Sequence, residues 1–160
     1  MDAEAELRLR LRVEDLSARY VHCIDDDRLE EWPELFVERG RYRVTTAENH
    51  ERGLPLPIVY ADSRAMLRDR VAALRQANIY EPQRYRHLVS SLIVDRVDAN
   101  TAEAVSNFHV VRVMQTGESM LFATGRYLDR VRLDGGRALF EERVVVLDSR
   151  AIDTLLAIPL

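Results

Sequence analysis

The residues best suited to acid–base chemistry are an acidic run that follows residue 24 and a histidine far along the chain. A carboxylate base beside a hydrogen-bond donor can move a proton on a small molecule in a closed pocket. Asp25 or Asp26 paired with His109 would supply both groups, and Tyr20 paired with Asp27 would do the same. Such a pair would suit a stand-alone isomerase or hydro-lyase with a cone-shaped fold and no cofactor. The more ordinary interpretation of His109 is a hydrogen-bonded core histidine.

Metal chemistry on this chain is limited by its cysteine count. Cys23 is the only cysteine, whereas a Rieske centre needs two cysteines and two histidines. The sequence therefore excludes that cluster and any disulfide within the chain. His22 stands close to residues 25–27 and could belong to a metal or acid–base cluster, but an Asp-rich helix end is more often a solvated cap. We expect no metal, no cofactor and no catalytic residue on this chain.

The residues typical of protein interfaces are densest in the segment 80–87. This segment contains Tyr80, Arg84, Tyr85, Arg86 and His87. Tyrosine and arginine are enriched where the binding energy of interfaces concentrates. We predict a subunit interface here. The alternative is a loop that leads into a strand, with the arginines paired to nearby acidic side chains.

Helices occupy the first half of the sequence. Apolar residues from Leu9 to Ile24 recur at steps of three and four, which predicts a helix over residues 7–24 with Cys23 in the core. A second short helix over residues 27–36 would be capped by Asp27 and kinked or split by Pro33. A third helix would follow Asp62 as its cap and end at residue 78.

Strands occupy the second half. A short strand is predicted at residues 42–44, and four long runs follow at about 85–94, 102–114, 120–133 and 138–147, separated by turn-forming residues. Short connections force neighbouring strands to pair antiparallel. The fold class is therefore α+β, with N-terminal helices packed on a curved, mainly antiparallel sheet, in one domain over residues 1–160.

The run 102–114 is apolar on both of its faces. Val105, Val111 and Val113 alternate with a second set that includes Phe108 and Val110. A sheet covered on one face and wet on the other should alternate cleanly between apolar and polar residues. Either the strand curls around its own core, or its second face meets another subunit.

Charge and composition exclude several kinds of partner. The chain has 160 residues, 47% of them hydrophobic, and a net charge of −4, with arginine supplying all 23 basic residues. No basic field is available for nucleic acid or for an anionic membrane. The acidic N-terminus is not a signal peptide, and no apolar run is long enough to span a bilayer. We expect a cytoplasmic protein.

Several motifs together resemble one known family. They are the run Leu29–Phe36 (LEEWPELF), the segments 41–45 (RYRVT) and 53–55 (GLP), the run 66–81 (MLRDRVAALRQANIYE), the segment 84–87 (RYRH) and the ending 148–160. Over residues 20–160 the sequence resembles the small (beta) subunits of aromatic-ring-hydroxylating dioxygenases. Within that family it is most similar to the small subunits of terephthalate dioxygenase and salicylate hydroxylase.

The resemblance implies a cone-shaped fold like that of nuclear transport factor 2 and a non-catalytic structural role. Such a subunit supports the assembly of a large (alpha) subunit, with three of each and a trimer of small subunits. The large subunit would carry the Rieske two-iron two-sulfur cluster and the mononuclear Fe(II), and a reductase would supply electrons from NAD(P)H. The substrate implied is an aromatic carboxylate. The resemblance carries no catalytic residue over to this chain.

Overall fold

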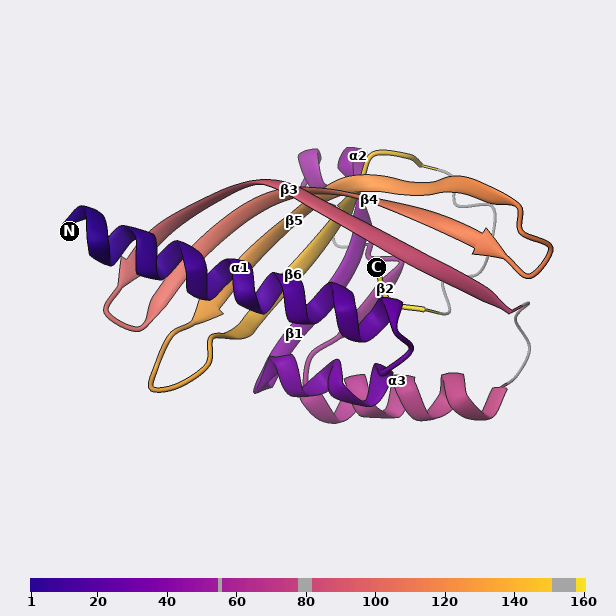
Figure 1. Ribbon diagram of the computed structural model, residues 1–160, viewed down its shortest axis with the longest axis horizontal. Helices are drawn as coiled ribbons and strands as arrows, with labels where there is room; N and C mark the ends of the chain where they lie inside the picture. Colours follow the sequence, from indigo (N-terminus) through magenta and orange to yellow (C-terminus); the bar gives the residue numbers. More distant parts are fainter. Residues whose placement is uncertain (55, 78–81, 151–157) are drawn as a thin grey trace.

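The computed structural model describes residues 1–54, 56–77, 82–150 and 158–160. A curved six-stranded sheet is crossed on one face by a long N-terminal helix, and a shorter helix packs against the first strand (Figure 1). We call the face that packs against the long helix the inner face, and the opposite face the outer face. The predicted α+β class, with helices on a mainly antiparallel sheet, is confirmed.

The long helix α1 spans Ala3–Asp25. Asp2 caps it, because its side chain accepts a hydrogen bond from the backbone N–H of Ala5 at 2.7 Å. The helix therefore begins four residues before the predicted start, which the apolar stripe alone could not show. The buried side chains are those of the predicted stripe, Cys23 among them. No helix in the described ranges combines the length and the apolar character needed to cross a membrane.

Two short 3-10 turns follow α1 in place of one helix. They are η1 (Leu29–Glu31) and η2 (Pro33–Leu35). The predicted split at Pro33 is confirmed, since proline begins the second turn and cannot donate a bond to the first. The predicted cap at Asp27 is wrong. Asp27 has φ of 58° and reverses the chain direction after α1, and Arg28 precedes the first turn without a side-chain cap.

The remaining helices are α2 (Ala47–Glu51) and α3 (Arg64–Ala77). The short α2 was not predicted, because its five residues carry no apolar stripe and none of them is buried. The predicted cap of α3 at Asp62 is wrong by one residue, since the hydroxyl of Ser63 accepts from the N–H of Met66 at 3.2 Å. The predicted end at Asn78 lies outside the described residues.

The six strands are arranged in the order β2-β1-β6-β5-β4-β3. They are β1 (Phe36–Thr46), β2 (Val59–Ala61), β3 (Gln83–Asp98), β4 (Thr101–Met114), β5 (Ser119–Arg132) and β6 (Leu139–Leu147). The predicted antiparallel pairing from β3 to β6 is confirmed. The exception is β1, which pairs in parallel with β6, so the first and last strands of the chain are neighbours inside the sheet. The predicted strand at 42–44 lies within β1.

The alternation along β4 shows what its two apolar faces contact. Phe108 and Val110 are buried on the inner face, whereas Val105, Val111 and Val113 are only half-buried on the outer face. The second apolar face is therefore not part of the core of the same chain. Such a face is typical of a surface that meets another protein.

Candidate functional site

The interior of the fold contains a buried carboxylate–imidazole pair. Asp25, at the end of α1, receives two hydrogen bonds from His87 in β3: one oxygen lies 2.6 Å from Nδ1 and the other accepts the backbone N–H at 2.8 Å. The two side chains are 2% and 0% exposed. Because a carboxylate oxygen accepts, Nδ1 of His87 carries the proton of this hydrogen bond. No partner for Nε2 occurs among the described residues.

The predicted pairing of Asp25 or Asp26 with His109 is wrong. His109 lies on the outer face of β4 and is exposed, because odd-numbered residues of this strand point away from α1. Asp26 is half-exposed and lies 3.6 Å from Arg28. Sequence spacing could not give the correct partner, because an acid at a helix end can reach whichever strand packs beneath it.

The predicted pairing of Tyr20 with Asp27 is also wrong. The carboxylate of Asp27 is exposed and accepts a hydrogen bond from Arg75 of α3 at 2.7 Å. Tyr20 points the other way, into the core, where it is fully buried. Asp27 does not share the buried face of Tyr20, because α1 ends at Asp25 and Asp27 has φ of 58°, outside the helical path.

Tyr20 and Tyr42 together hold the backbone of Leu160. The hydroxyl of Tyr20 donates to the main-chain oxygen of Leu160, and the hydroxyl of Tyr42 lies 3.2 Å from the same oxygen and 3.2 Å from the N–H of Leu160. Burial, reinforced by the neighbouring Tyr42, raises the pKa of Tyr20 well above its ordinary value. Tyr20 is therefore a neutral hydrogen-bond donor rather than a base.

A second buried ion pair lies beside these tyrosines. Arg143 of β6 makes two parallel hydrogen bonds to Asp129 of β5, both 2.8 Å long. Its guanidinium lies over the rings of Tyr20, Tyr127 and Phe140, at 4.2, 3.8 and 4.3 Å from their centroids. Arginine can bond a carboxylate at its edge while its flat faces contact aromatic rings. The guanidinium of Arg143 is thus held on its edge by Asp129 and on its faces by aromatic rings. Sequence analysis did not identify this pair.

A metal site at His22 is not supported by the geometry. His22 is exposed on α1, and Asp25 points into the interior toward His87. Within the ranges that the structure describes, no three His, Cys, Asp or Glu side chains are grouped as metal ligands would be. Cys23 is buried, and burial raises the pKa of its thiol to about 12. The thiolate that a metal requires is therefore disfavoured.

The interface predicted at residues 80–87 divides into two faces. Tyr85 and His87 are buried on the inner face, at 3% and 6% exposure, so their side chains do not reach a partner and that part of the prediction is wrong. Arg84 and Arg86 are exposed on the outer face. The sequence already indicated this division, because residues two apart in a strand share a face and neighbouring residues do not. Tyr80 lies outside the described residues.

Arg84 and Arg86 adjoin exposed apolar residues of the outer face. In the register of the sheet Arg84 is opposite Val113, and Arg86 is opposite Val111, which in turn is opposite Leu121. Leu121 is 59% exposed and Leu88 is 48% exposed. We call these six residues the outer-face patch: Arg84, Arg86, Leu88, Val111, Val113 and Leu121. Neither of its arginines has an ion-pair partner in the described part of the chain.

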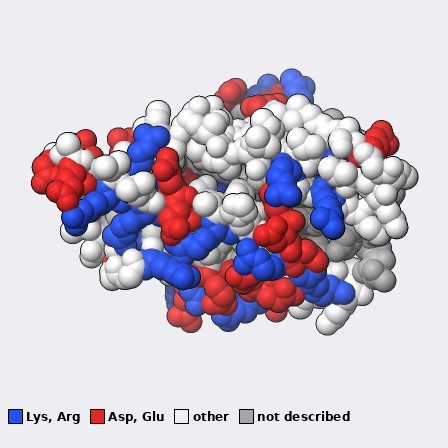
Figure 2. Space-filling view, in the orientation of Figure 1, with Lys and Arg blue, Asp and Glu red and all other residues white. Residues whose placement is uncertain are grey.

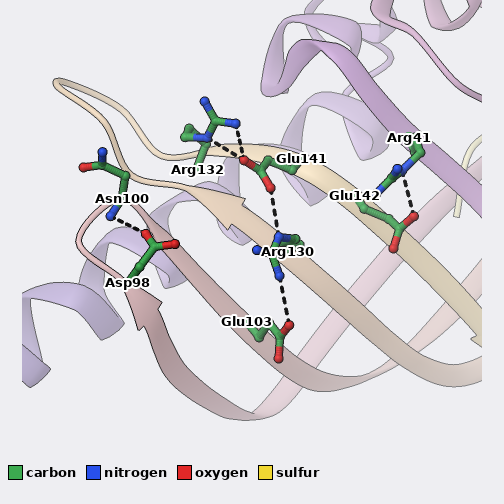
Figure 3. Close-up of polar contacts among 8 residues, drawn as sticks. All are labelled: Arg41, Asp98, Asn100, Glu103, Arg130, Arg132, Glu141 and Glu142. Carbon is green, nitrogen blue, oxygen red and sulfur yellow. Dashed lines mark hydrogen bonds and ion pairs between the residues drawn. The ribbon is translucent and has the colours of Figure 1, made fainter.

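Other arginines of the sheet are already paired. Arg130 of β5 bonds Glu103 of β4 at 3.1 Å and Glu141 of β6 at 3.0 Å, and Arg132 also contacts Glu141 (Figure 3). Arg41 of β1 lies 3.0 Å from Glu142. The three arginines are thus neutralised by glutamates of neighbouring strands of the same chain. Arg84 and Arg86, in contrast, have no such partner among the residues that the structure describes.

The distribution of charge over the surface is uneven. Figure 2 shows charged side chains over α1 and along the lower side, where α3 lies, and a broad uncharged area along the upper side, over the strands. The charged side includes the bonds from Arg75 to Asp27 and Glu30 and from Arg68 to Glu34. The helices thus have a solvated surface. On the side shown in Figure 2, the less polar surface lies over the strands.

Comparison with known proteins gives a consistent result across most of the chain. The profile of the family "Ring hydroxylating beta subunit" matches residues 19–154. Terephthalate 1,2-dioxygenase, terminal oxygenase component subunit beta 1, from Comamonas sp, is 44% identical over 150 residues, 94% of this chain and 97% of that protein. The anthranilate 1,2-dioxygenase small subunit from Burkholderia cepacia is 39% identical over 145 residues, 91% of this chain and 90% of that protein.

A solved structure gives the same result for the fold. The beta subunit of a provisionally named aromatic-ring-hydroxylating dioxygenase from Novosphingobium aromaticivorans DSM 12444 superposes with a TM-score of 0.90. It is 37% identical and the match covers 98% of this chain and 99% of that one. The cone-shaped fold expected from the sequence is therefore confirmed.

Proposed function

Because the chain belongs to the ring hydroxylating beta subunit family, whose beta subunits work with an alpha-subunit partner, we propose that it is the non-catalytic small subunit of a Rieske non-haem iron dioxygenase. The observation that carries the proposal is the match over residues 19–154. The oxygenase is an oxidoreductase that acts on an aromatic carboxylate. Support for this substrate class comes from two relatives, which are named for terephthalate and anthranilate, both benzene carboxylates.

The redox groups belong to the large subunit in this proposal. A Rieske cluster needs two cysteine ligands, and this chain has one cysteine, buried in the core with its thiol donating to the main-chain oxygen of Tyr20 at 3.2 Å. The residues of this chain do not fit the cluster. The two-iron two-sulfur cluster and the mononuclear Fe(II) reside on the large subunit, which receives electrons through a reductase. Three large and three small subunits form the cytoplasmic complex, with the small subunits as a trimer.

The outer-face patch is the surface proposed to contact the large subunit. Arg84 and Arg86, which have no ion-pair partner among the described residues, donate hydrogen bonds to carboxylates of the large subunit, and the apolar residues of the patch are covered on assembly. An arginine paired to a buried partner carboxylate leaves that carboxylate unpaired when it is removed, at a cost of about 2–5 kcal/mol, whereas a surface arginine contributes roughly 0–1 kcal/mol. The measured loss of binding free energy therefore distinguishes an arginine in an interface from an arginine on a solvated strand.

Co-purification tests the proposal. The chain is co-expressed with a tagged large subunit, and the amount of small subunit retained is compared for the native chain, Arg84→Ala and Arg86→Ala. We expect retention to fall by more than tenfold for at least one of these variants, with unchanged thermal melts of the chain alone. Arg41→Ala is the matched control, since Arg41 is also exposed on a strand but is paired to Glu142 within the chain. Failure of the native chain to co-purify would contradict the role of small subunit. Unchanged retention of both variants would contradict only the location of the contact.

A further inference from the structure

The outer face of β1 is covered near its end by the part of the chain that follows the strand. Thr45 points to the outer face, because its neighbour Val44 is in the core, yet Thr45 is only 4% exposed. The helix α2 begins directly after β1, and the hydroxyl of Thr46 accepts from the N–H of Asn49 at 3.2 Å. The chain then returns to the strand, where the N–H of Ile58 donates to the main-chain oxygen of Val44 at 2.7 Å. A cavity of about 250 Å³ lies between β1 and this covering segment, and we call it the β1–α2 cavity.

The polar lining of the β1–α2 cavity is suited to an anion. It consists of Arg43 and Thr45 from β1 and Asn49 and His50 from α2. Guanidinium, amide and imidazole groups all supply N–H donors. None of the described residues that line the cavity is acidic. No carboxylate of this lining therefore competes with a bound anion for the donors.

Arg43 has a donor that the chain does not use. Its Nε atom is buried and has no hydrogen-bond partner, and Arg43 forms no ion pair with any residue that the structure describes. Its neighbours across the sheet are Tyr60 of β2 and Val144 of β6, neither of which can neutralise its charge. A buried donor without an acceptor destabilises a fold. The Nε atom is therefore better explained by an acceptor on a bound molecule than by packing alone.

The remaining lining limits the size and the polarity of a ligand. Leu54, Leu56 and Pro57 provide an apolar wall beside the polar residues. Inorganic phosphate or sulfate has no apolar part to contact this wall. Drug-sized ligands occupy pockets of about 300–1,000 Å³, so a cavity of about 250 Å³ suits a smaller molecule.

We propose that the β1–α2 cavity is a binding site for a small carboxylic acid with an apolar body, of the size of benzoate. The guanidinium of Arg43 donates two parallel hydrogen bonds to the carboxylate, which is the geometry that arginine favours with this group. Asn49 and His50 supply further donors, and the apolar body lies against the two leucines and the proline of the wall. The site is separate from the role of the chain in supporting a large subunit, so its failure would leave that role unchanged.

Calorimetric titration of the full-length chain with benzoate tests the proposal. The native chain should bind benzoate, and Arg43→Met should bind it more weakly by about tenfold or more, because the charge-assisted hydrogen bonds are lost. Arg39→Met is the matched control and should bind as the native chain does, since Arg39 is exposed on the same strand and does not line the cavity. Arg43→Met should melt no lower than the native chain without ligand, because no partner of Arg43 is left unpaired. A lower melting temperature with unchanged benzoate binding would make Arg43 a structural residue and overturn the proposal.

Two other ligands define what the cavity recognises. Benzamide has the same ring without the charge and should bind more weakly than benzoate by about tenfold or more. Equal binding of the two would show that the carboxylate is not recognised. Inorganic phosphate should also bind more weakly than benzoate, and tighter binding of phosphate would overturn the assignment to a carboxylic acid.

Nuclear magnetic resonance of the native chain locates the ligand without any substitution. Benzoate should shift the backbone amide signals of Thr45, Asn49 and His50 and leave those of α1 and α3 unchanged. This measurement also decides the outcome if Arg43→Met does not fold. Shifts confined to other parts of the chain, or no binding of benzoate by the native chain, would overturn the proposal.

Discussion

Two buried carboxylates in this protein, Asp25 and Asp129, are each held by two hydrogen bonds. Asp25 receives both hydrogen bonds that His87 can donate to it, and Asp129 receives two from Arg143. The aromatic rings around Arg143 replace water on the faces of the guanidinium. Removing one member of such a pair leaves the other as an uncompensated buried charge. Single substitutions at these residues should therefore be more harmful than the loss of the pair.

The Arg143–Asp129 pair allows this to be measured. Arg143→Met should lower the free energy of unfolding by about 3–5 kcal/mol, because Asp129 keeps its burial and loses both donors. The double variant Arg143→Met, Asp129→Leu should lose less than the single variant. Urea unfolding of each chain gives the values. Arg132→Met is the control, since Arg132 is 42% exposed and its substitution should change the stability by roughly 0–1 kcal/mol. A double variant less stable than either single one would contradict the argument.

Cys23 gives a prediction on reactivity and its pH dependence. Its pKa is raised to about 12, chiefly by burial, so the neutral thiol persists in the folded chain throughout the neutral range. Labelling of the native chain by a disulfide reagent should be slow and should not increase between about pH 7 and pH 9. The same chain in urea should react faster as the pH rises through its unperturbed value. Rapid native-state labelling would show that the thiol is accessible, contrary to its 2% exposure.

For single residues, the sequence showed which side chains matter more reliably than it showed which side chains they contact. The core position of Cys23 followed from helical spacing and is confirmed. Asp25 was recognised as chemically interesting, but its partner is His87 rather than His109. Which of the two histidines faces α1 depends on the face that each strand presents. Only the packing of the sheet decides that.

The close packing of β5 and β6 depends on a single glycine. A Cβ atom at Gly125 would lie 2.0 Å from the main-chain oxygen of Val146 and 3.1 Å from a ring carbon of Phe108. The first of these contacts is with backbone, which cannot move aside as a side chain does. Gly125 is opposite Leu147, at the end of the pairing between these strands. A side chain here would therefore separate β6 from β5.

Gly125→Ala should destabilise the fold by about 1–3 kcal/mol or more, because the strands must shift to admit a methyl group. Gly136→Ala is a matched control, since a Cβ at that position meets nothing within 4 Å and its φ does not favour glycine. It should change the stability by less than about 0.5 kcal/mol. Thermal melts of both variants check the expectation. Equal stability of the two would mean that β5 and β6 are packed less closely than described.

Elements with a long repeating pattern were predicted well, and those defined by local capping were not. The stripe of α1 and the alternation in β3 to β6 extend over many residues, so single exceptions do not hide them. The caps at Asp27 and Asp62 were each assigned from one side chain, and neighbouring residues compete for that role. The parallel pairing of β1 with β6 could not be predicted, because strand order within a sheet has no local signature.

For the whole molecule, the proposed division of labour predicts the metal content. The isolated chain should bind iron only substoichiometrically and should not hydroxylate an aromatic ring, since one buried cysteine and exposed His22 and His109 cannot form the required sites. Metal analysis of the purified chain, before and after exposure to Fe(II), is the measurement. The complex with the large subunit is the positive control. One tightly held iron per isolated chain would contradict the proposal.

The parallel pairing of β1 with β6 also sets a limit on the kinetics of folding. About 90 residues separate the end of β1 from the start of β6, and at roughly 5–20 residues per second a ribosome needs about 5–20 s to make them. Until then β1 has only the three-residue β2 as a neighbour, and its other edge is unpaired. Contacts between distant parts of a chain form late, and unpaired strand edges promote aggregation. The interval before β6 emerges is therefore the period in which the nascent chain most needs a chaperone.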